Sequence, residues 1–336
     1  MEINVTFQNM LSDFFLKYIP SRNTYSVNTI KAYRDTFVLL CQYHKDCIKK
    51  PISKIKMDAI DEKYVYGFLN WLEVDKHYSS SSLNQRLAGL HAFFRYVQSH
   101  APEYQALCQT VLGIKYKKVL SMPMNYLTVG AIKLVLAQPD INSMEGIRDL
   151  ALIALLYDSG TRVQELADMT IGDLRYEKPA TIKATGKGGK TRIIPIMPQT
   201  ADILREYIRV IGNTCPTAPL FFNKNKQKLS RAGITYILQK HVNLARKNNR
   251  DMFPKNVTPH VLRRSKAMHL LEGGVNLIYI RDFLGHASVT TTEIYAKANP
   301  EIKRKAIEAA SIDVLPEEHF SSDEKAELLD WLKGII

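Results

Sequence analysis

Apolar residues recur every three or four positions through the first third of the chain, the spacing of helices with one buried face. The pattern predicts helices over residues 6–19, 26–43, 58–74 and 82–98. The second has the apolar stripe Ile30, Tyr33, Phe37, Leu40 and Cys41, and its start can be capped by Ser26 or Asn28. In the last helix a neighbouring polar face is expected to hold Asn84, His91, Arg95 and Gln98. These helices predict a small all-α bundle.

The second half of the chain combines helical patterns with one β-rich stretch. Residues 181–185 and 191–196 read as strands, and the glycine-rich turn between them predicts a hairpin. Gly160 is placed to end a helix. Helices are predicted over residues 128–137, 146–158, 199–211, 230–248, 260–272, 275–284, 290–297, 300–310 and 322–334. The predicted fold class is mainly α, with a helical N-terminal domain and a mostly helical second domain that contains a small β-sheet.

The periodicity breaks between these halves, at residues 114–125. We therefore predict an N-terminal domain over 1–113, a linker over 114–125 and a second domain over 126–336. The linker contains Lys115, Lys117, Lys118 and Pro123. Lysines in a linker can lie along a phosphate backbone or can simply be solvated, and both interpretations stay open.

The net charge of the chain bears on the class of molecule that it binds. The 336 residues carry 46 basic and 33 acidic side chains, a formal net charge of +13, with a sequence pI near 9.4. An excess of this size fits a polyanion partner such as nucleic acid, and it also occurs in basic proteins without such a partner, so both interpretations stay open. There is no long apolar run of the kind that crosses a membrane and no secretory signal pattern, and the four cysteines form no Cys-x-x-Cys pair. These features predict a cytoplasmic protein.

Two familiar sites are disfavoured. Gly189-Lys190-Thr191 matches the end of a phosphate-binding P-loop, but Ala184 stands where the leading glycine is needed and β-structure replaces the following helix. Cys41, His44 and Cys47 share one helical stretch, yet a structural zinc site needs four ligands and no matching pair lies elsewhere. We therefore expect neither nucleotide hydrolysis nor a bound metal.

An arginine stands at a predicted helix start in the second domain. Thr161 and Gln164 form a capping-box pattern, which places Arg162 in the first turn of a new helix just after Gly160. Helix N-termini attract anions, and an arginine there adds a bidentate clamp for phosphate.

A second cluster follows further along the chain. Pro259 suits the first position of a helix, and His260 and Arg263 then share one face of it. His286 comes directly after another predicted helix, and Tyr295 lies in a later one. Arginines can neutralise the charge that spreads over phosphate oxygens during phosphoryl transfer, and a tyrosine hydroxyl can act as the nucleophile.

In these motifs the chain resembles the tyrosine recombinases, the phage-integrase-like site-specific recombinases. The resemblance rests on Gly160-Thr161-Arg162-x-x-Glu165-Leu166, Gly186-Lys187-Gly188-x-Lys190-x-Arg192, His260-x-x-Arg263, Leu284-Gly285-His286 and Tyr295, in that order. It implies a C-shaped clamp around DNA, with a core-binding domain in the N-terminal half. It also implies no cofactor and no metal.

The resemblance also implies a role for each matching residue. Arg162 and Arg263 would bind the scissile phosphate, Lys187 would protonate the departing 5′-oxygen, His260 would assist proton transfer at the tyrosine, His286 would hydrogen-bond the phosphate, and Tyr295 would attack to form a 3′-phosphotyrosyl link. Glu165 would orient the site without touching the DNA. The DNA-contacting residues we expect are Lys31, Arg34, Arg86, Arg95, Lys115, Lys117, Lys118 and Lys190.

The implied activity is site-specific recombination between double-stranded DNA sites, by a tetramer that assembles on DNA from monomers. Integration or excision of a mobile element is favoured. Resolution of chromosome or plasmid dimers, a nicking-closing topoisomerase-like activity and a non-catalytic DNA-binding relative stay open. Arg264 and Lys266 depart from the common family pattern and suit a transposon-associated branch. No arm-binding domain is recognised, which favours simple recombination. The acidic, apolar-striped tail helix at 311–336 can pack on its own subunit or on a neighbouring protomer, and the resemblance favours the neighbouring protomer.

Overall fold

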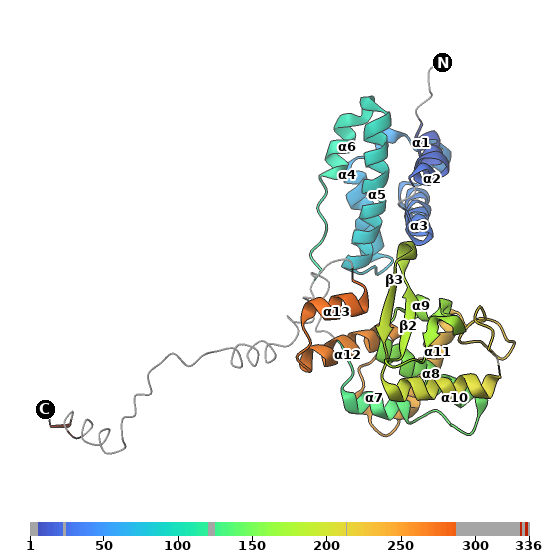
Figure 1. Cartoon of the computed structure of the whole chain (residues 1–336). Coiled ribbons are helices and arrows are strands. Elements are labelled where there is room, and N and C mark those ends of the chain that lie inside the picture. Colours follow the sequence, from blue (N-terminus) through green and yellow to red (C-terminus); the bar gives the residue numbers. More distant parts are fainter. Residues whose placement is uncertain are drawn as a thin grey trace. The chain divides into compact units, whose positions relative to one another are not determined.

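The computed structural model describes residues 6–22, 25–119, 125–212 and 214–286, together with 330, 333 and 334 (Figure 1). The chain divides into two compact units, Met1–Met122 and Pro123–Ile336. The side chain of Lys187, the nucleophile candidate Tyr295 and almost all of the predicted tail helix lie outside the described residues. No described helix is both long enough and apolar enough to cross a membrane.

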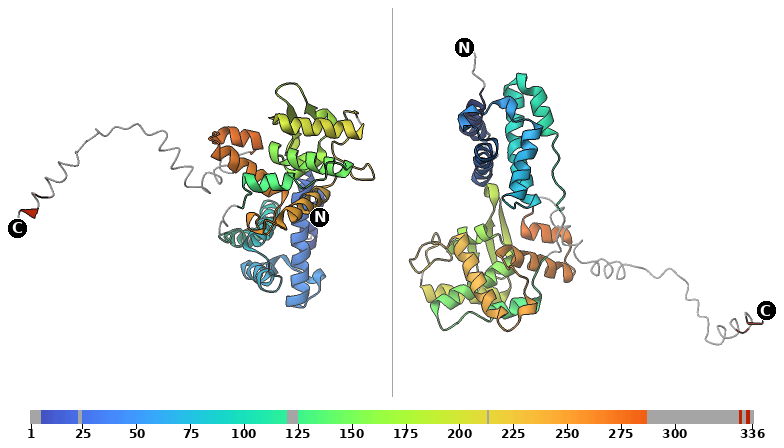
Figure 2. Two further views of the ribbon diagram at one scale, coloured as in Figure 1. Left: turned by 90° about the horizontal axis from the view of Figure 1, so that it is seen from below. Right: turned by 180° about the vertical axis from the view of Figure 1, so that it is seen from behind.

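The N-terminal unit is a helical bundle. Its α-helices are α1 (Phe7–Asp13), α2 (Ile19–Ser21), α3 (Val27–Tyr43), α4 (Glu62–Val74), α5 (Ser80–His100) and α6 (Gln105–Leu112), with π-helical turns at Phe14–Tyr18 and His44–Ile48. Phe14 and Phe93 are fully buried and pack edge to face, with ring centroids 5.5 Å apart. In the views of Figures 1 and 2, α5 runs alongside α6.

Side-chain caps set the helix starts in this unit. Asp61 accepts the amide N–H of Tyr64 at 2.7 Å, so α4 begins at residue 62 and the predicted start at 58 is wrong. Ser79 caps α5, which therefore begins two residues before the predicted helix. The polar face predicted for His91 is also wrong. His91 is 3% exposed, and its ring nitrogens contact the carbonyl oxygen of Val111 and the hydroxyl of Tyr116.

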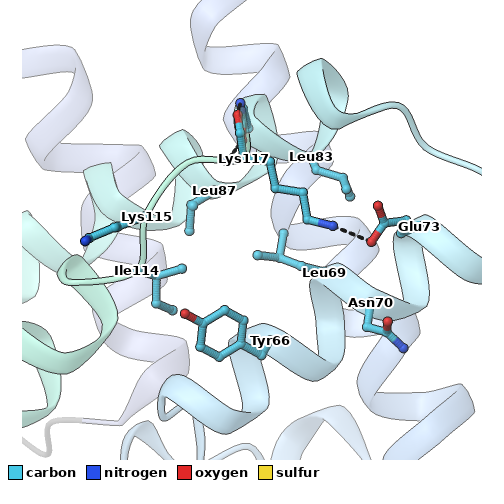
Figure 3. A pocket seen from close by; sticks show the side chains of 10 residues that line it. Tyr66, Leu69, Asn70, Glu73, Leu83, Leu87, Ile114, Lys115 and Lys117 are labelled. Carbon is cyan, nitrogen blue, oxygen red and sulfur yellow. Dashed lines mark hydrogen bonds and ion pairs between the residues drawn. The ribbon is translucent and has the colours of Figure 1, made fainter. Parts of the chain in front are cut away.

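The chain that follows α6 stays attached to the N-terminal unit. Ile114 is buried in its core. The amide N–H of Lys117 donates to Asn84 Oδ1, and Asn84 Nδ2 donates to the Lys117 carbonyl, both at 2.9 Å. Lys117 also pairs with the Glu73 carboxylate beside a pocket of about 260 Å³ (Figure 3). The first residues of the segment predicted as a linker are therefore held against α4 and α5.

The second unit is mostly helical and contains a small sheet, so the predicted fold class is confirmed. Its helices are α7 (Val129–Leu136), α8 (Met144–Ser159), α9 (Val163–Asp168), α10 (Pro198–Ile211), α11 (Arg231–Arg246), α12 (Pro259–Glu272) and α13 (Leu277–Leu284). The antiparallel sheet has the order β1 (Leu174–Arg175), β2 (Thr181–Thr185) and β3 (Thr191–Pro195). The hairpin is as predicted; β1 was not predicted.

Helix α8 lies at the centre of this unit and packs against α7, α10, α11 and α12. It carries Asp149, which is fully buried. The Asp149 carboxylate accepts from Arg148 Nη2 at 2.7 Å and from His241 Nε2 at 2.8 Å, and it pairs with Lys240 at 3.2 Å. Burial alone would raise the pKa of Asp149, but the hydrogen bonds from His241 and Arg148 outweigh it and hold the pKa below its usual value.

Asp149→Asn should lower the free energy of unfolding by about 3 kcal/mol at pH 7, because it breaks a buried charge cluster. The folded-state pKa is depressed, so the stabilisation is present at neutral pH and is lost as the pH falls below about 4. Urea unfolding followed by circular dichroism at pH 7 and pH 3 measures both effects. Asp202→Asn is the matched control, since Asp202 pairs with Arg205 on the surface. An equal loss in both variants would contradict this account.

Candidate active site

Arg162 lies where α8 ends and α9 begins. Gly160 ends α8 in the left-handed conformation, with φ of 55°, as its position in the sequence predicts. Arg162 is the N-cap residue of α9, and its amide N–H donates to Glu165 Oε2 at 2.9 Å. The predicted capping pair of Thr161 and Gln164 is therefore wrong by one position. Thr161 is buried instead, with its hydroxyl 3.0 Å from that of Ser159.

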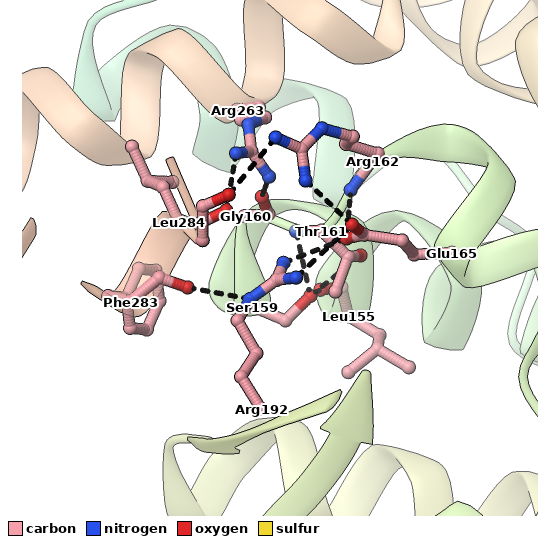
Figure 4. A network of polar contacts seen from close by, with 11 residues as sticks. Leu155, Ser159, Gly160, Thr161, Arg162, Glu165, Arg192, Arg263, Phe283 and Leu284 are labelled. Carbon is pink, nitrogen blue, oxygen red and sulfur yellow. Dashed lines mark hydrogen bonds and ion pairs between the residues drawn. The ribbon is translucent and has the colours of Figure 1, made fainter. Parts of the chain in front are cut away.

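Glu165 is a buried carboxylate held between two arginines (Figure 4). Arg162 Nη1 donates to Glu165 Oε1 at 2.8 Å. Arg192 donates to both carboxylate oxygens, from Nη1 at 3.1 Å and from Nη2 at 2.7 Å. Burial by itself would raise the pKa of Glu165, but the hydrogen bonds from Arg192 and Arg162 lower it to about 2. Glu165 is therefore ionised at any pH near neutrality.

Arg263 joins the ends of two helices. It lies on α12 and is 2% exposed. Its Nη1 donates to the Gly160 carbonyl at 2.6 Å and its Nη2 to the Leu284 carbonyl at 2.5 Å (Figure 4). Arg162 Nη2 donates to the Gly285 carbonyl at 3.2 Å. Carbonyls at helix C-termini lack partners within the helix and carry partial negative charge, so guanidinium groups bind them well.

The two predicted histidines adjoin these arginines. His260 is in the first turn of α12 and keeps an exposed edge; His286 follows Gly285, which ends α13 with φ of 65°. Burial, then the charges of Arg263 and Arg162, lower the pKa of His286 to about 4. Partial removal from water and nearby arginines also lower the pKa of His260. Both imidazoles are therefore neutral at pH 7.

The turn of the β2–β3 hairpin lies beside the same group of residues. Lys187 lies in the turn Lys187–Gly189, in which Gly188 and Gly189 have φ of 77° and 74°, a conformation that glycine adopts without strain. A recess of about 910 Å³ lies between this turn and α13 and is lined by Arg162, Gly186, Gly188, Lys190, Thr191, Arg192, Arg281, Asp282, Gly285 and His286. Of the predicted arginines and histidines, Arg162 and His286 line this open recess, and Arg263 contacts the carbonyl oxygens of Gly160 and Leu284.

The residues predicted to contact DNA differ in their exposure and in their contacts within the protein. The exposed ones are Lys31, Arg34, Arg95, Lys115, Lys117, Lys118 and Lys190. Arg34 pairs with Asp35 at 2.8 Å. Arg86 is only partly exposed and donates from α5 to the Ala32 carbonyl on α3 at 3.1 Å. Arg86 and Arg95 are nine residues apart, so they point to opposite sides of α5.

Two contacts near the predicted site were not predicted from the sequence. Arg192 ties β3 to α9 and α13, since its Nε also donates to the Phe283 carbonyl at 3.1 Å. The alternation of side chains along the strand could have predicted that Arg192 faces inward, because Arg192 lies on the same face as buried Ile194. Lys266 forms an ion pair with Asp158 at 2.9 Å. Within the described ranges, no three His, Cys, Asp or Glu side chains are grouped to hold a metal ion.

Comparison with known proteins agrees with this geometry. Residues 125–301 match the model of the phage integrase family, and residues 13–100 match the phage integrase N-terminal SAM-like domain. The integrase/recombinase y4rC of Sinorhizobium fredii is 34% identical over 90% of this chain and 91% of its own length. The tyrosine recombinase XerD of Staphylococcus epidermidis is 31% identical over 88% of this chain and 97% of its own length.

A solved structure shares the fold. The XerH recombinase, bound to a palindromic difH substrate after cleavage, has a TM-score of 0.67 at 22% identity, covering 85% of this chain and 80% of XerH. The chain therefore belongs to the phage integrase family and is a tyrosine-type site-specific recombinase.

The His286 imidazole should stay neutral down to about pH 4 in the folded protein. Arg162→Gln should raise its pKa, because one of the positive charges that disfavour the imidazolium is removed. Titration of histidine ring nitrogens by ¹⁵N NMR, with the His286 signal assigned from His286→Gln, measures both values. An unchanged pKa in Arg162→Gln would show that the arginine charge does not reach the ring.

Proposed function

We propose that this recombinase breaks and rejoins double-stranded DNA at specific sites through the residues that surround the recess. The observation that supports this proposal is the convergence of Arg162, Arg263, His260 and His286 at the ends of α8 and α13. Arg162 is the accessible guanidinium, since its side chain is 45% exposed. It would bind a non-bridging oxygen of the scissile phosphate together with Arg263.

The reaction is a transesterification at one phosphorus atom. The Tyr295 hydroxyl oxygen attacks, the bond to the 5′-oxygen breaks, and the DNA 3′-end becomes a phosphotyrosyl ester. The tyrosine proton passes to the neutral imidazole of His260, and Lys187 donates a proton to the departing 5′-oxygen. Neutral His286 donates a hydrogen bond to the phosphate. The 5′-hydroxyl of another strand then reverses these steps and releases the tyrosine.

Exchange of all the strands of two duplexes requires four cleavages, and each protomer has one Tyr295. We therefore propose a tetramer on two DNA sites in the cytoplasm. As biological role we propose integration or excision of a mobile element, which the similarity to the integrase/recombinase of Sinorhizobium fredii supports. The XerD relative favours resolution of DNA dimers as the second candidate. Recovery of flanking inverted repeats around the gene, and their recombination on a plasmid by the purified protein, separates the two.

Tyr295→Phe should abolish the covalent protein–DNA adduct and leave DNA affinity within about twofold, because only the hydroxyl oxygen is lost. A nicked suicide substrate analysed on a denaturing gel measures the adduct, and a gel-shift titration measures affinity. An adduct that persists in the variant would remove Tyr295 from the mechanism.

Two further variants should distinguish binding of the scissile phosphate, which affects the cleavage rate, from general electrostatic attraction to DNA, which affects affinity. Arg263→Ala should reduce cleavage on the order of a hundredfold with little change in affinity, since it stabilises charge that develops in the transition state. Lys118→Ala should lower the slope of log affinity against log salt by about one. Lys117→Ala is the matched control and should change the slope less, because Glu73 already compensates its charge. Equal losses of affinity in Arg263→Ala and Lys118→Ala would contradict the separation.

Cleavage should proceed at an unchanged rate in EDTA and without ATP. The arginines supply the positive charge, and the phosphotyrosyl ester keeps the free energy of the broken bond. Adduct formation on the suicide substrate after extensive dialysis against EDTA measures this. A rate restored only by added magnesium would contradict it.

A further inference from the structure

Arg192 is the third arginine of the network and the one whose guanidinium is directed into the protein. Its side chain is 15% exposed, against 45% for Arg162. Its Nη1 and Nη2 donate to Glu165, and its Nε donates to the Phe283 carbonyl (Figure 4). All three nitrogens therefore have protein acceptors.

The position of the Arg192 side chain is fixed by the β2–β3 pairing and by the turn that follows α13. In the β2–β3 register it lies opposite Ala184, with its side chain on the same face as buried Ile194. A Cβ atom added at Gly285 would lie 2.9 Å from Arg192 Nη1, so the turn after α13 lies directly against the guanidinium. Arg192 cannot swing outward without leaving the Glu165 carboxylate buried beside a single arginine.

The balance of charge around Glu165 depends on this arginine. Glu165 carries one negative charge and contacts two positive side chains, Arg162 and Arg192. With both present, one positive charge stays uncompensated. Without Arg192, the Arg162–Glu165 pair would be neutral, and the carboxylate would hold the Arg162 guanidinium away from an incoming anion. Such interactions are strong in a site that is partly shielded from water.

We propose that Arg192 is a positioning residue that neutralises Glu165, so that Arg162 keeps its positive charge and its outward orientation for the scissile phosphate. This inference rests on the proposed function. Arg192 does not bind the phosphate itself. Its role is to let the site contain a buried carboxylate, which fixes the start of α9, without losing the charge that the reaction needs.

The test removes the positive charge of Arg192 first, and then the charges of Arg192 and Glu165 together. Arg192→Gln should slow adduct formation on a suicide substrate on the order of a hundredfold. The double variant Glu165→Gln with Arg192→Gln should recover at least about tenfold of that loss, because Arg162 regains its uncompensated charge. On the same substrate with a neutral methylphosphonate at the scissile position, Arg192→Gln should stay within about threefold of wild type, since the scissile group carries one negative charge fewer.

Controls separate the possible failures. Arg205→Gln, which removes an exposed arginine paired with Asp202, should be as active as wild type, and thermal melting checks that each variant is folded. If Arg192→Gln does not fold, Glu165→Gln is compared with the double variant, and the two should form the adduct at similar rates, because without the carboxylate Arg192 has no charge to neutralise. Equal losses on both substrates, or no recovery in the double variant, would overturn the inference. Absence of an adduct in the wild-type protein would instead refute the proposed function.

Discussion

The buried carboxylate of Glu165 is the constraint on which the candidate active site depends. A carboxylate removed from water must be paired and hydrogen-bonded, and Glu165 uses the amide N–H of Arg162 and the guanidinium groups of Arg162 and Arg192. Because Arg192 also binds the Phe283 carbonyl, a single negative charge connects α9, β3 and α13. These three elements, which lie far apart in the sequence, are thereby held together.

The ends of two helices complete this frame. Both α8 and α13 end in a glycine in the left-handed conformation, and the carbonyls at these ends accept hydrogen bonds from Arg263 and Arg162. The same guanidinium groups that would meet a phosphate are thus oriented in advance by backbone acceptors. Arginines oriented in advance need not reorganise when they bind an anion, which is the condition for strong electrostatic stabilisation.

Burial, and after it the nearby positive charges, lower the pKa values of the two histidines, His286 and His260. Both rings can therefore accept or share a proton at neutral pH. The cluster around Asp149 shows the other use of the same interaction. There a buried carboxylate is surrounded by Arg148, Lys240 and His241 away from the recess, and the result is stability of the unit.

Local patterns in the sequence predicted most of the described helices, although not α6, and also the β2–β3 hairpin and the glycine at the end of α8. Periodicity and turn chemistry act over a few residues, so they can be recognised in the sequence. Only the tertiary structure decided which polar groups face inward. His91 is buried by contacts with α6 and Tyr116, and Arg86 and Lys117 meet partners distant in sequence. Arg192 likewise gains its importance from Glu165 and Phe283, 27 and 91 residues away, which no local pattern can place beside it.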